Sequence, residues 1–149
     1  MTTNPSSSAV TVTADSSGLV SLVNPQDSNH QRAVRVIEGL ERLHGSILIP
    51  SDVFTETINV LGKKLGHTVA LAVAQRLLTD ATFILAESDA ELREVAMEDF
   101  RAQPASVSFT DCLVMAYADR YETLDIFGFD EVFARNGYHL PKPLPKAAV

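Results

Sequence analysis

Short apolar runs alternate with longer amphipathic segments from residue 10 to about residue 140. Residues 10–14 (Val-Thr-Val-Thr-Ala) alternate in polarity and are rich in β-branched side chains, which is typical of a strand, and the strand is expected to end at Asp15. Three further segments of this kind follow, and residues 138–140 are a candidate fifth strand. The predicted strands are residues 10–14, 46–49, 81–86 and 123–129.

The segments between these strands have helical periodicity. After the second strand, Phe54, Ile58, Leu61 and Leu65 recur with the spacing of one helix face. We also expect a short helix at residues 16–23, a longer one to about residue 44, and helices at residues 68–78, from Ser88 to about residue 101, and at residues 109–122. A brief helix is expected after residue 129.

Capping and breaking residues set the expected ends of these helices. Asp27 or Ser28 can cap the second helix, and Ser88 and Ser108 can cap the two that surround Pro104. Gly45 and Gly66 end helices, because glycine is the residue that most readily leaves the helical conformation. The expected elements therefore alternate between strand and helix along the chain.

Strands separated by helices predict an α/β fold with a parallel sheet flanked by helices on both faces, a Rossmann-like arrangement of three layers. The 149 residues suit one domain, and there is no internal repeat. We therefore expect a single domain at residues 10–140. Residues 1–9 are expected to form a disordered leader, and residues 141–149 a proline-rich tail.

Composition indicates a folded protein outside the membrane. Apolar residues make up 46% of the chain and charged residues 21%, and no apolar run approaches the roughly 20 residues that span a bilayer. The first nine residues contain no basic residue and no apolar block, so we do not expect them to form a secretory signal. The single cysteine, Cys112, cannot form an intramolecular disulfide, and we expect a packing role for it in a cytoplasmic protein.

The net charge of −7 excludes a protein that coats nucleic acid through general electrostatic attraction. Arg32, Arg35, Lys63, Lys64 and Arg120 can contact phosphates, but they form no basic run, and solvated helix faces account for most of them. The acidity still allows a metal-dependent nuclease, because two divalent cations would offset four carboxylates.

Four acids are expected at the carboxyl edge of the predicted sheet, where ligands bind in such folds. Asp15 and Asp130 each follow a predicted strand, and Glu56 lies near the start of the helix after the second strand. Asp111 lies in the first turn of a helix that runs antiparallel to the strand it precedes, so this turn is also expected at the carboxyl edge.

Each acid also has a purely structural explanation. Asp15 and Asp130 can be helix N-caps, Ser108 and Asp111 have the spacing of a capping box, and Glu56 can be a solvated acid near a helix N-terminus. Taken together, however, four converging carboxylates would repel one another strongly. Such a set is favourable when a divalent cation neutralises it, and oxygen ligands suit Mg²⁺ or Mn²⁺.

The ordered set of motifs resembles the PIN domain family, and specifically the VapC-type toxins of bacterial toxin–antitoxin pairs. The resemblance covers roughly residues 11 to 140. The matching positions are Asp15-Ser16, Asn29-His30, residues 50–56 (Pro-Ser-Asp-Val-Phe-Thr-Glu), residues 108–111 (Ser-Phe-Thr-Asp), and residues 129–133 (Phe-Asp-Glu-Val-Phe) with Gly137.

This resemblance implies a metal-dependent endoribonuclease that uses Mg²⁺ or Mn²⁺. Asp15 and Asp111 would hold the metal, Glu56 would accept a proton from the attacking water or bind a second ion, and Asp130 would complete the metal shell. The expected products carry a 5′-phosphate and a 3′-hydroxyl. The resemblance further implies a cognate antitoxin protein and a homodimer, and the alanine-rich helix at residues 69–78 is a candidate interface.

One position departs from the family pattern. The family usually has Thr, Ser or Asn two residues before the last acid, where this chain has Gly128. We therefore expect the role of Asp130 to be weaker than those of the other three acids. A non-catalytic PIN module that binds RNA or a protein partner is the main alternative function.

Phosphoryl-transfer domains on similar sheets fit less well. A signalling receiver would have paired acids after its first strand and a lysine after its last strand, and this chain has neither. A phosphatase of the haloacid dehalogenase type would have Asp-x-Asp, but Ser17 occupies the place of its second acid.

Overall fold

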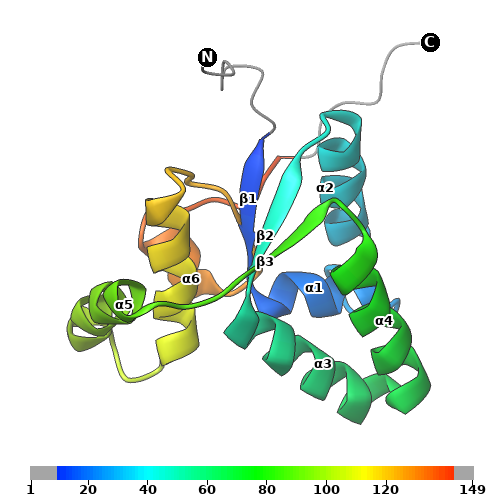
Figure 1. Cartoon of the computed structure of the whole chain (residues 1–149), viewed down its shortest axis with the longest axis horizontal. Coiled ribbons are helices and arrows are strands. Elements are labelled where there is room, and N and C mark those ends of the chain that lie inside the picture. The colour runs from blue at the N-terminus through cyan, green and yellow to red at the C-terminus, as the bar shows by residue number, and fades with distance from the viewer. Residues whose placement is uncertain (1–9, 143–149) are drawn as a thin grey trace.

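The computed structural model describes residues 10–142, which form a parallel sheet with helices on both faces (Figure 1). The four strands lie in the order β3-β2-β1-β4, and all neighbouring pairs are parallel. Their bounds are β1 (Thr11–Ala14), β2 (Ser46–Pro50), β3 (Phe83–Ala86) and β4 (Ile126–Phe127). The predicted α/β fold is therefore confirmed. The predicted leader and all but two residues of the predicted tail lie outside the described residues.

Six helices connect these strands in the described part of the chain, and a seventh, α7, follows β4. In Figure 1, α1 to α4 lie on one side of the sheet, and α5 and α6 lie on the other. The bounds are α1 (Ser16–Val23), α2 (His30–Arg42), α3 (Ser51–Leu65), α4 (His67–Thr79), α5 (Ala90–Ala102), α6 (Phe109–Arg120) and α7 (Glu131–Arg135). None of these helices is long and apolar enough to cross a membrane.

The strand order places a topological switch point between β1 and β4. The chain moves from β1 to β2 and then to β3 in one direction, and it then crosses back to place β4 on the other side of β1. Because parallel crossovers are right-handed, the reversal also moves the connecting helices to the opposite face. The loops after β1 and β4 therefore diverge at the carboxyl edge, which is where open α/β sheets bind ligands.

The core is formed by the central strands and by α6. Val12, Ala14, Ile47 and Ile49 of β1 and β2 are fully buried. Helix α6 is buried over seven consecutive residues, 112–118, because it packs against β1, α5 and α7. Cys112 belongs to this buried stretch, as its predicted packing role requires. The rigid packing of α6 fixes the position of its first turn at the carboxyl edge of the sheet.

Two predicted strands are shorter than expected because turns occupy their ends. Residues 81–82 belong to a turn in which the amide of Thr82 donates to Asp80 Oδ1 at 2.9 Å. Residues 123–125 form a turn in which Thr123 Oγ1 accepts from the amide of Asp125 at 3.0 Å. The candidate fifth strand is reduced to a single parallel bridge between Asp125 and His139.

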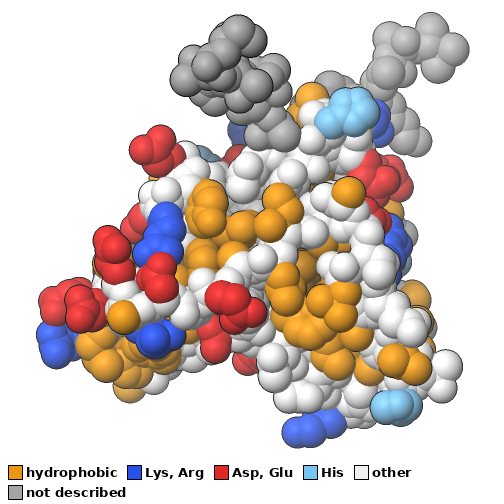
Figure 2. Space-filling view, viewed as in Figure 1, with side chains coloured by type: hydrophobic (Ala, Val, Ile, Leu, Met, Phe, Trp, Pro, Cys, Tyr) orange, Lys and Arg blue, Asp and Glu red, His pale blue; other side chains and the backbone are white. Residues whose placement is uncertain are grey.

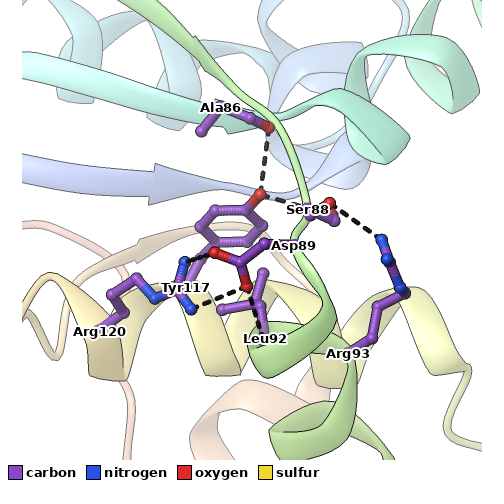
Figure 3. Close-up of polar contacts among 7 residues, drawn as sticks. All are labelled: Ala86, Ser88, Asp89, Leu92, Arg93, Tyr117 and Arg120. Atoms are coloured by element: carbon purple, nitrogen blue, oxygen red, sulfur yellow. Dashed lines mark hydrogen bonds and ion pairs between the residues drawn. The ribbon is translucent and has the colours of Figure 1, made fainter.

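Two predicted N-caps were wrong. Asp89, not Ser88, caps α5, because Asp89 Oδ1 accepts from the amide of Leu92 at 2.8 Å (Figure 3). The Ser88 hydroxyl instead donates to Asp52 Oδ2 of α3 at 2.8 Å. Helix α2 begins at residue 30, with Asn29 as its N-cap, and Asp27 closes the preceding turn by accepting from the amide of Asn29 at 2.8 Å.

Candidate active site

Asp15 is a buried carboxylate held in one orientation at the end of β1. Its side chain is 2% exposed and caps α1. Oδ2 accepts two hydrogen bonds, from the amide of Ser17 at 3.2 Å and from the Ser17 hydroxyl at 2.7 Å. The N-cap role considered for this residue is therefore real. It also fixes the carboxylate at the topological switch point.

Asp111 is held in the first turn of α6 by a capping box. The amide of Asp111 donates to Ser108 Oγ, and Asp111 Oδ2 accepts from the amide of Ser108, both at 3.0 Å. The predicted capping box is confirmed. Since α6 runs antiparallel to the strands, the box turns the Asp111 carboxylate toward the carboxyl edge and restricts its rotation.

Asp130 is the N-cap residue of α7, but its side chain makes no capping hydrogen bond. It is more exposed than Asp15 and Asp111. The preceding residue is anchored, because the amide of Phe129 donates to Ser17 Oγ at 2.9 Å. The backbone that carries Asp130 is thus tied to the residue that also orients Asp15.

These three acids form a compact group, which we call the acid cluster: Asp15, Asp111 and Asp130. One carboxylate oxygen from each lies within 4.8 Å of the other two. The oxygens around one octahedral Mg²⁺ lie about 3 to 4 Å apart, since each sits about 2.1 Å from the ion. The chemistry of the donor set therefore suits a divalent cation that prefers oxygen ligands, and the spacing limit of 4.8 Å is slightly wider than one ion requires.

The acid cluster carries an electrostatic strain that a cation would relieve. Burial, opposed by the Ser17 hydrogen bonds and assisted by the negative charges of Asp130 and Asp111, raises the pKa of Asp15 to about 7. The pKa of Asp130 is also raised, first by burial and then by Asp111. The ion pairs among the described residues engage other carboxylates, namely Asp80, Asp89, Glu98, Asp125 and Glu131.

Glu56 lies outside the acid cluster. The structure brings three of the four predicted acids together and places Glu56 across a hollow of about 330 Å³ that it shares with Asp130. Its negative charge contributes to the raised pKa of Asp130. Glu56 therefore faces the same space without belonging to the group of candidate metal ligands.

Two rows of side chains on α3 face two separate hollows. Glu56, Val60 and Lys64 follow each other at intervals of four residues and line the hollow beside Asp130. The second row lines a hollow of about 520 Å³ that Glu56, Val60 and Thr110 also line. This row consists of Asp52, Thr55, Asn59 and Lys63. Glu56 thus separates two spaces, and each contains one lysine.

Ser17 was missed as a candidate site residue, and it lies beside Gly128, where Asp15 and Phe133 exclude a side chain. A Cβ at Gly128 would lie 2.8 Å from Asp15 Cβ and 3.0 Å from Phe133 Cε2, which leaves no room for a side chain. The Ser17 hydroxyl lies 3.3 Å from that position. Ser17 therefore places a hydroxyl beside Asp15 where the family pattern has a polar residue at position 128. The Asp-x-Ser spacing at the start of α1 was the available signal in the sequence.

Comparisons with known proteins agree with this geometry. The family model for the PIN domain matches residues 12–137. A search of curated proteins gives no match. Among solved structures, the chain is similar to VapC20 of Mycobacterium tuberculosis, described as a toxin that cleaves the sarcin–ricin loop, with a TM-score of 0.76 and 22% sequence identity. The match covers 89% of this chain and 99% of VapC20, and at this identity it shows a shared fold.

Proposed function

This chain belongs to the PIN domain family, and we propose that it is a metal-dependent endoribonuclease that acts as the toxin of a toxin–antitoxin pair. The observation that carries this proposal is the acid cluster, because three carboxylates from three separate elements lie within 4.8 Å without an ion-pair partner of their own among the described residues. The likeness to VapC20, which is described as an RNA-cleaving toxin, supports the substrate class.

We propose that Asp15, Asp111 and Asp130 hold Mg²⁺ or Mn²⁺. When bound there, the cation supplies Lewis-acid stabilisation of a scissile phosphate and makes a water molecule more acidic. Asp15 and Asp111 contribute rigidity. The Asp15 carboxylate accepts two hydrogen bonds from Ser17, and the Asp111 carboxylate accepts one from the amide of Ser108, within a capping box that also ties the Asp111 backbone to Ser108 Oγ. Asp130, which is less constrained, completes the set of ligands.

Glu56 is the candidate general base. It is exposed, lies outside the acid cluster and faces the hollow beside Asp130. A carboxylate in this place can accept a proton from the attacking water while the clustered acids remain bound to the cation. Hydrolysis in this manner leaves a 5′-phosphate and a 3′-hydroxyl on the cleaved RNA.

Lys63 and Lys64 are the candidate contacts to the RNA backbone. Each lines one of the two hollows that flank Glu56. Both side chains are exposed, so they can contact phosphates on either side of the bond to be cleaved. This arrangement gives local attraction to a polyanion on a chain whose net charge is −7.

The PIN family membership further supports three proposals about the setting of this activity. We propose a cognate antitoxin protein as the partner that inhibits the nuclease, a homodimer as the assembly, and the cytoplasm as the location. Exposed apolar side chains of α4 and β3 offer a surface for assembly, and Figure 2 shows hydrophobic side chains gathered over this part of the molecule. The largest of them are Leu71, Leu78, Ile84 and Leu85.

Digestion of total cellular RNA tests the proposed activity. We expect the purified protein to cut RNA at defined positions in Mg²⁺ or Mn²⁺, and we expect a chelator to stop the reaction. Mapping of the new ends identifies the 5′-phosphate and the cut sites. RNA that binds but stays intact under all metal conditions would favour the non-catalytic PIN module instead.

A further inference from the structure

A third hollow, of about 380 Å³, opens on the other side of Asp130. Its lining includes Arg32 of α2, Phe129 and Asp130 after β4, and Tyr138 and His139 near the end of the described chain. This volume falls within the range of about 300–1,000 Å³ that is usual for small-molecule sites. The lining of this hollow is mostly apolar, and more so than that of the hollows beside α3, so it suits a flat and largely apolar group.

The aromatic side of this hollow is built from a fixed ring. The Phe129 backbone is tied to Ser17 Oγ at 2.9 Å, and its ring meets Phe127 edge to face with centroids 6.3 Å apart. The Arg32 guanidinium carbon lies 5.4 Å from the centre of the Phe129 ring. Aromatic rings and guanidinium planes are the surfaces on which proteins stack unpaired bases.

We propose that this hollow binds one nucleobase of the RNA substrate, turned out of its stack beside the bond that is cleaved. The base would stack on Phe129 and Arg32, and the side chains of Asp130 and His139 would face its polar edge. Asp130 belongs both to this hollow and to the acid cluster, so a base held here lies next to a phosphate at the cluster. This inference rests on the proposed ribonuclease function.

The inference defines the class of RNA that is cut. A base inside a regular helix cannot enter the hollow, because stacking and pairing hold it in place, whereas a base in a loop or a single strand can. The nuclease is therefore expected to cut unpaired RNA, and one position near the cut is expected to matter more than its neighbours.

A double-mutant cycle tests this inference. One change is a substitution in the protein, and the other is an abasic position in the RNA. Cut sites are first mapped on total cellular RNA, and short RNAs containing one site are then made with a single abasic position at each place around the cut. For the intact protein, we expect one abasic position to reduce kcat/KM at least about fivefold, which is the usual range for the loss of one stacked base. Phe129→Leu is expected to reduce kcat/KM for the intact RNA by a similar factor. For this variant, the same abasic position is expected to cause no further loss of kcat/KM.

Further variants separate base binding from a structural effect. Phe129→Tyr keeps the aromatic face and is expected to retain activity and sensitivity to the abasic position, and Arg32→Gln is expected to give a smaller loss with the same insensitivity. Phe100→Leu is the matched control, because Phe100 is an exposed ring of α5 that pairs with Phe109 and does not line the hollow. The Mn²⁺ affinity of Phe129→Leu is expected to equal that of the unaltered protein.

Four results would overturn the inference. If no abasic position slows cleavage, or if the losses from Phe129→Leu and the abasic site multiply, then no base binds on Phe129 and the proposed ribonuclease function still stands. If Phe129→Leu lowers the Mn²⁺ affinity as far as it lowers cleavage, its role is structural. If the intact protein cuts no RNA, the proposed function fails, and this inference fails with it.

Discussion

Asp15 and Asp89 follow strands at the same edge of one sheet, and each caps the helix that comes next, yet their electrostatic surroundings are opposite. Asp89 forms a bidentate ion pair with Arg120, at 2.8 and 3.0 Å, and caps α5 (Figure 3). The Arg120 hydrogen bond lowers the pKa of Asp89 to about 2. Burial and neighbouring acids instead raise the pKa of Asp15 to about 7.

The surroundings of Asp89 have the features of a structural joint. Tyr117 of α6 donates to the carbonyl of Ala86 at 3.2 Å, and Arg93 donates to the carbonyl of Ser88 at 2.9 Å (Figure 3). Each charged group in this joint has a partner, so the contacts connect β3, α5 and α6 without a ligand.

The acid cluster has the opposite property. Amides and a hydroxyl fix Asp15 and Asp111, Asp130 makes no capping hydrogen bond, and the three negative charges repel one another. Hydrogen bonds from Ser17 and Ser108 set the geometry, but they do not neutralise three carboxylates. The comparison shows that an acid at a strand end is informative about function only when its charge partners are known. The paired acid joins elements of the fold, whereas the clustered acids without ion pairs are the ones that we propose hold a cation.

The largest expected effect is the loss of cleavage when one rigid acid is neutralised. Asp15→Asn and Asp111→Asn should each lower kcat by at least about 100-fold, because each removes a group that positions charge stabilisation for the transition state. Asparagine keeps a side-chain oxygen that can accept the capping hydrogen bonds, so the fold should be retained. Cleavage of a mapped RNA and circular dichroism measure the two properties.

Asp89→Asn is the matched control for these variants. It should leave kcat within about twofold of the unaltered protein while it lowers the Tm by a few degrees, since it weakens an ion pair that joins α5 to α6. Full activity of Asp15→Asn, or loss of activity in well-folded Asp89→Asn, would reverse the assignment of the two regions.

A smaller effect is expected at Asp130. Its carboxylate is exposed and makes no capping hydrogen bond, so it is held less rigidly than Asp15 or Asp111. We expect Asp130→Asn to lower kcat by about 10-fold, in the range of groups that support metal ligands. A loss as large as that of Asp15→Asn, measured on the same RNA, would make Asp130 an equal member of the acid cluster.

Lys63 and Lys64 should affect RNA binding more than the chemical step. Lys63→Gln and Lys64→Gln are each expected to raise KM by about threefold with kcat nearly unchanged, and to reduce the slope of log KM against log salt by about one. Lys142→Gln makes the same charge change on an exposed residue that lines neither α3 hollow. Equal effects of all three substitutions would indicate general attraction and not contacts beside Glu56.

The raised pKa of Asp15 predicts a pH dependence of stability in the absence of metal. Because this pKa rises from 3.8 in the unfolded chain to about 7 in the fold, the native state binds the proton more tightly, and stability falls as pH rises through this window. We expect the Tm to fall by several degrees between pH 5 and pH 8 in chelator. Asp89 titrates near pH 2, outside this range.

Asp15→Asn provides the reference for this pH series. It removes the titrating group at position 15 and leaves every other ionisable residue in place. The decrease in Tm between pH 5 and pH 8 should therefore be smaller in Asp15→Asn than in the unaltered protein. Parallel curves for the two proteins, measured by thermal melts in chelator, would show that ionisation of Asp15 does not affect the stability of the fold.

The sequence was sufficient to predict most elements, because their patterns are local. The stripe from Phe54 to Leu65 and the β-branched residues before Asp15 each depend on neighbours within a few residues. The carboxyl-edge position of Asp111 also followed from chain direction alone. By contrast, the strand order, and with it the switch point between β1 and β4, depends on contacts between distant segments.

The parts of the site that were missed depend on side-chain reach between elements. Ser88 and Asp89 are both good N-cap residues for α5. Asp52, which lies 36 positions away in the sequence, accepts a hydrogen bond from the Ser88 hydroxyl, and Asp89 is left as the N-cap. The lack of space for a side chain at position 128 could not be predicted, because it depends on how closely Asp15 and Ser17 approach this position in the fold. The separation of Glu56 from the acid cluster likewise depends on the packing of α3.

Calorimetric titration with Mn²⁺ at pH 8 tests the central claim most directly, because it measures cation binding without requiring the RNA target. The unaltered protein and Asp89→Asn should bind Mn²⁺ with the same affinity, and Asp15→Asn should bind at least about 10-fold more weakly. Equal Mn²⁺ affinity in the unaltered protein and in well-folded Asp15→Asn would contradict the claim that Asp15, Asp111 and Asp130 form a cation site.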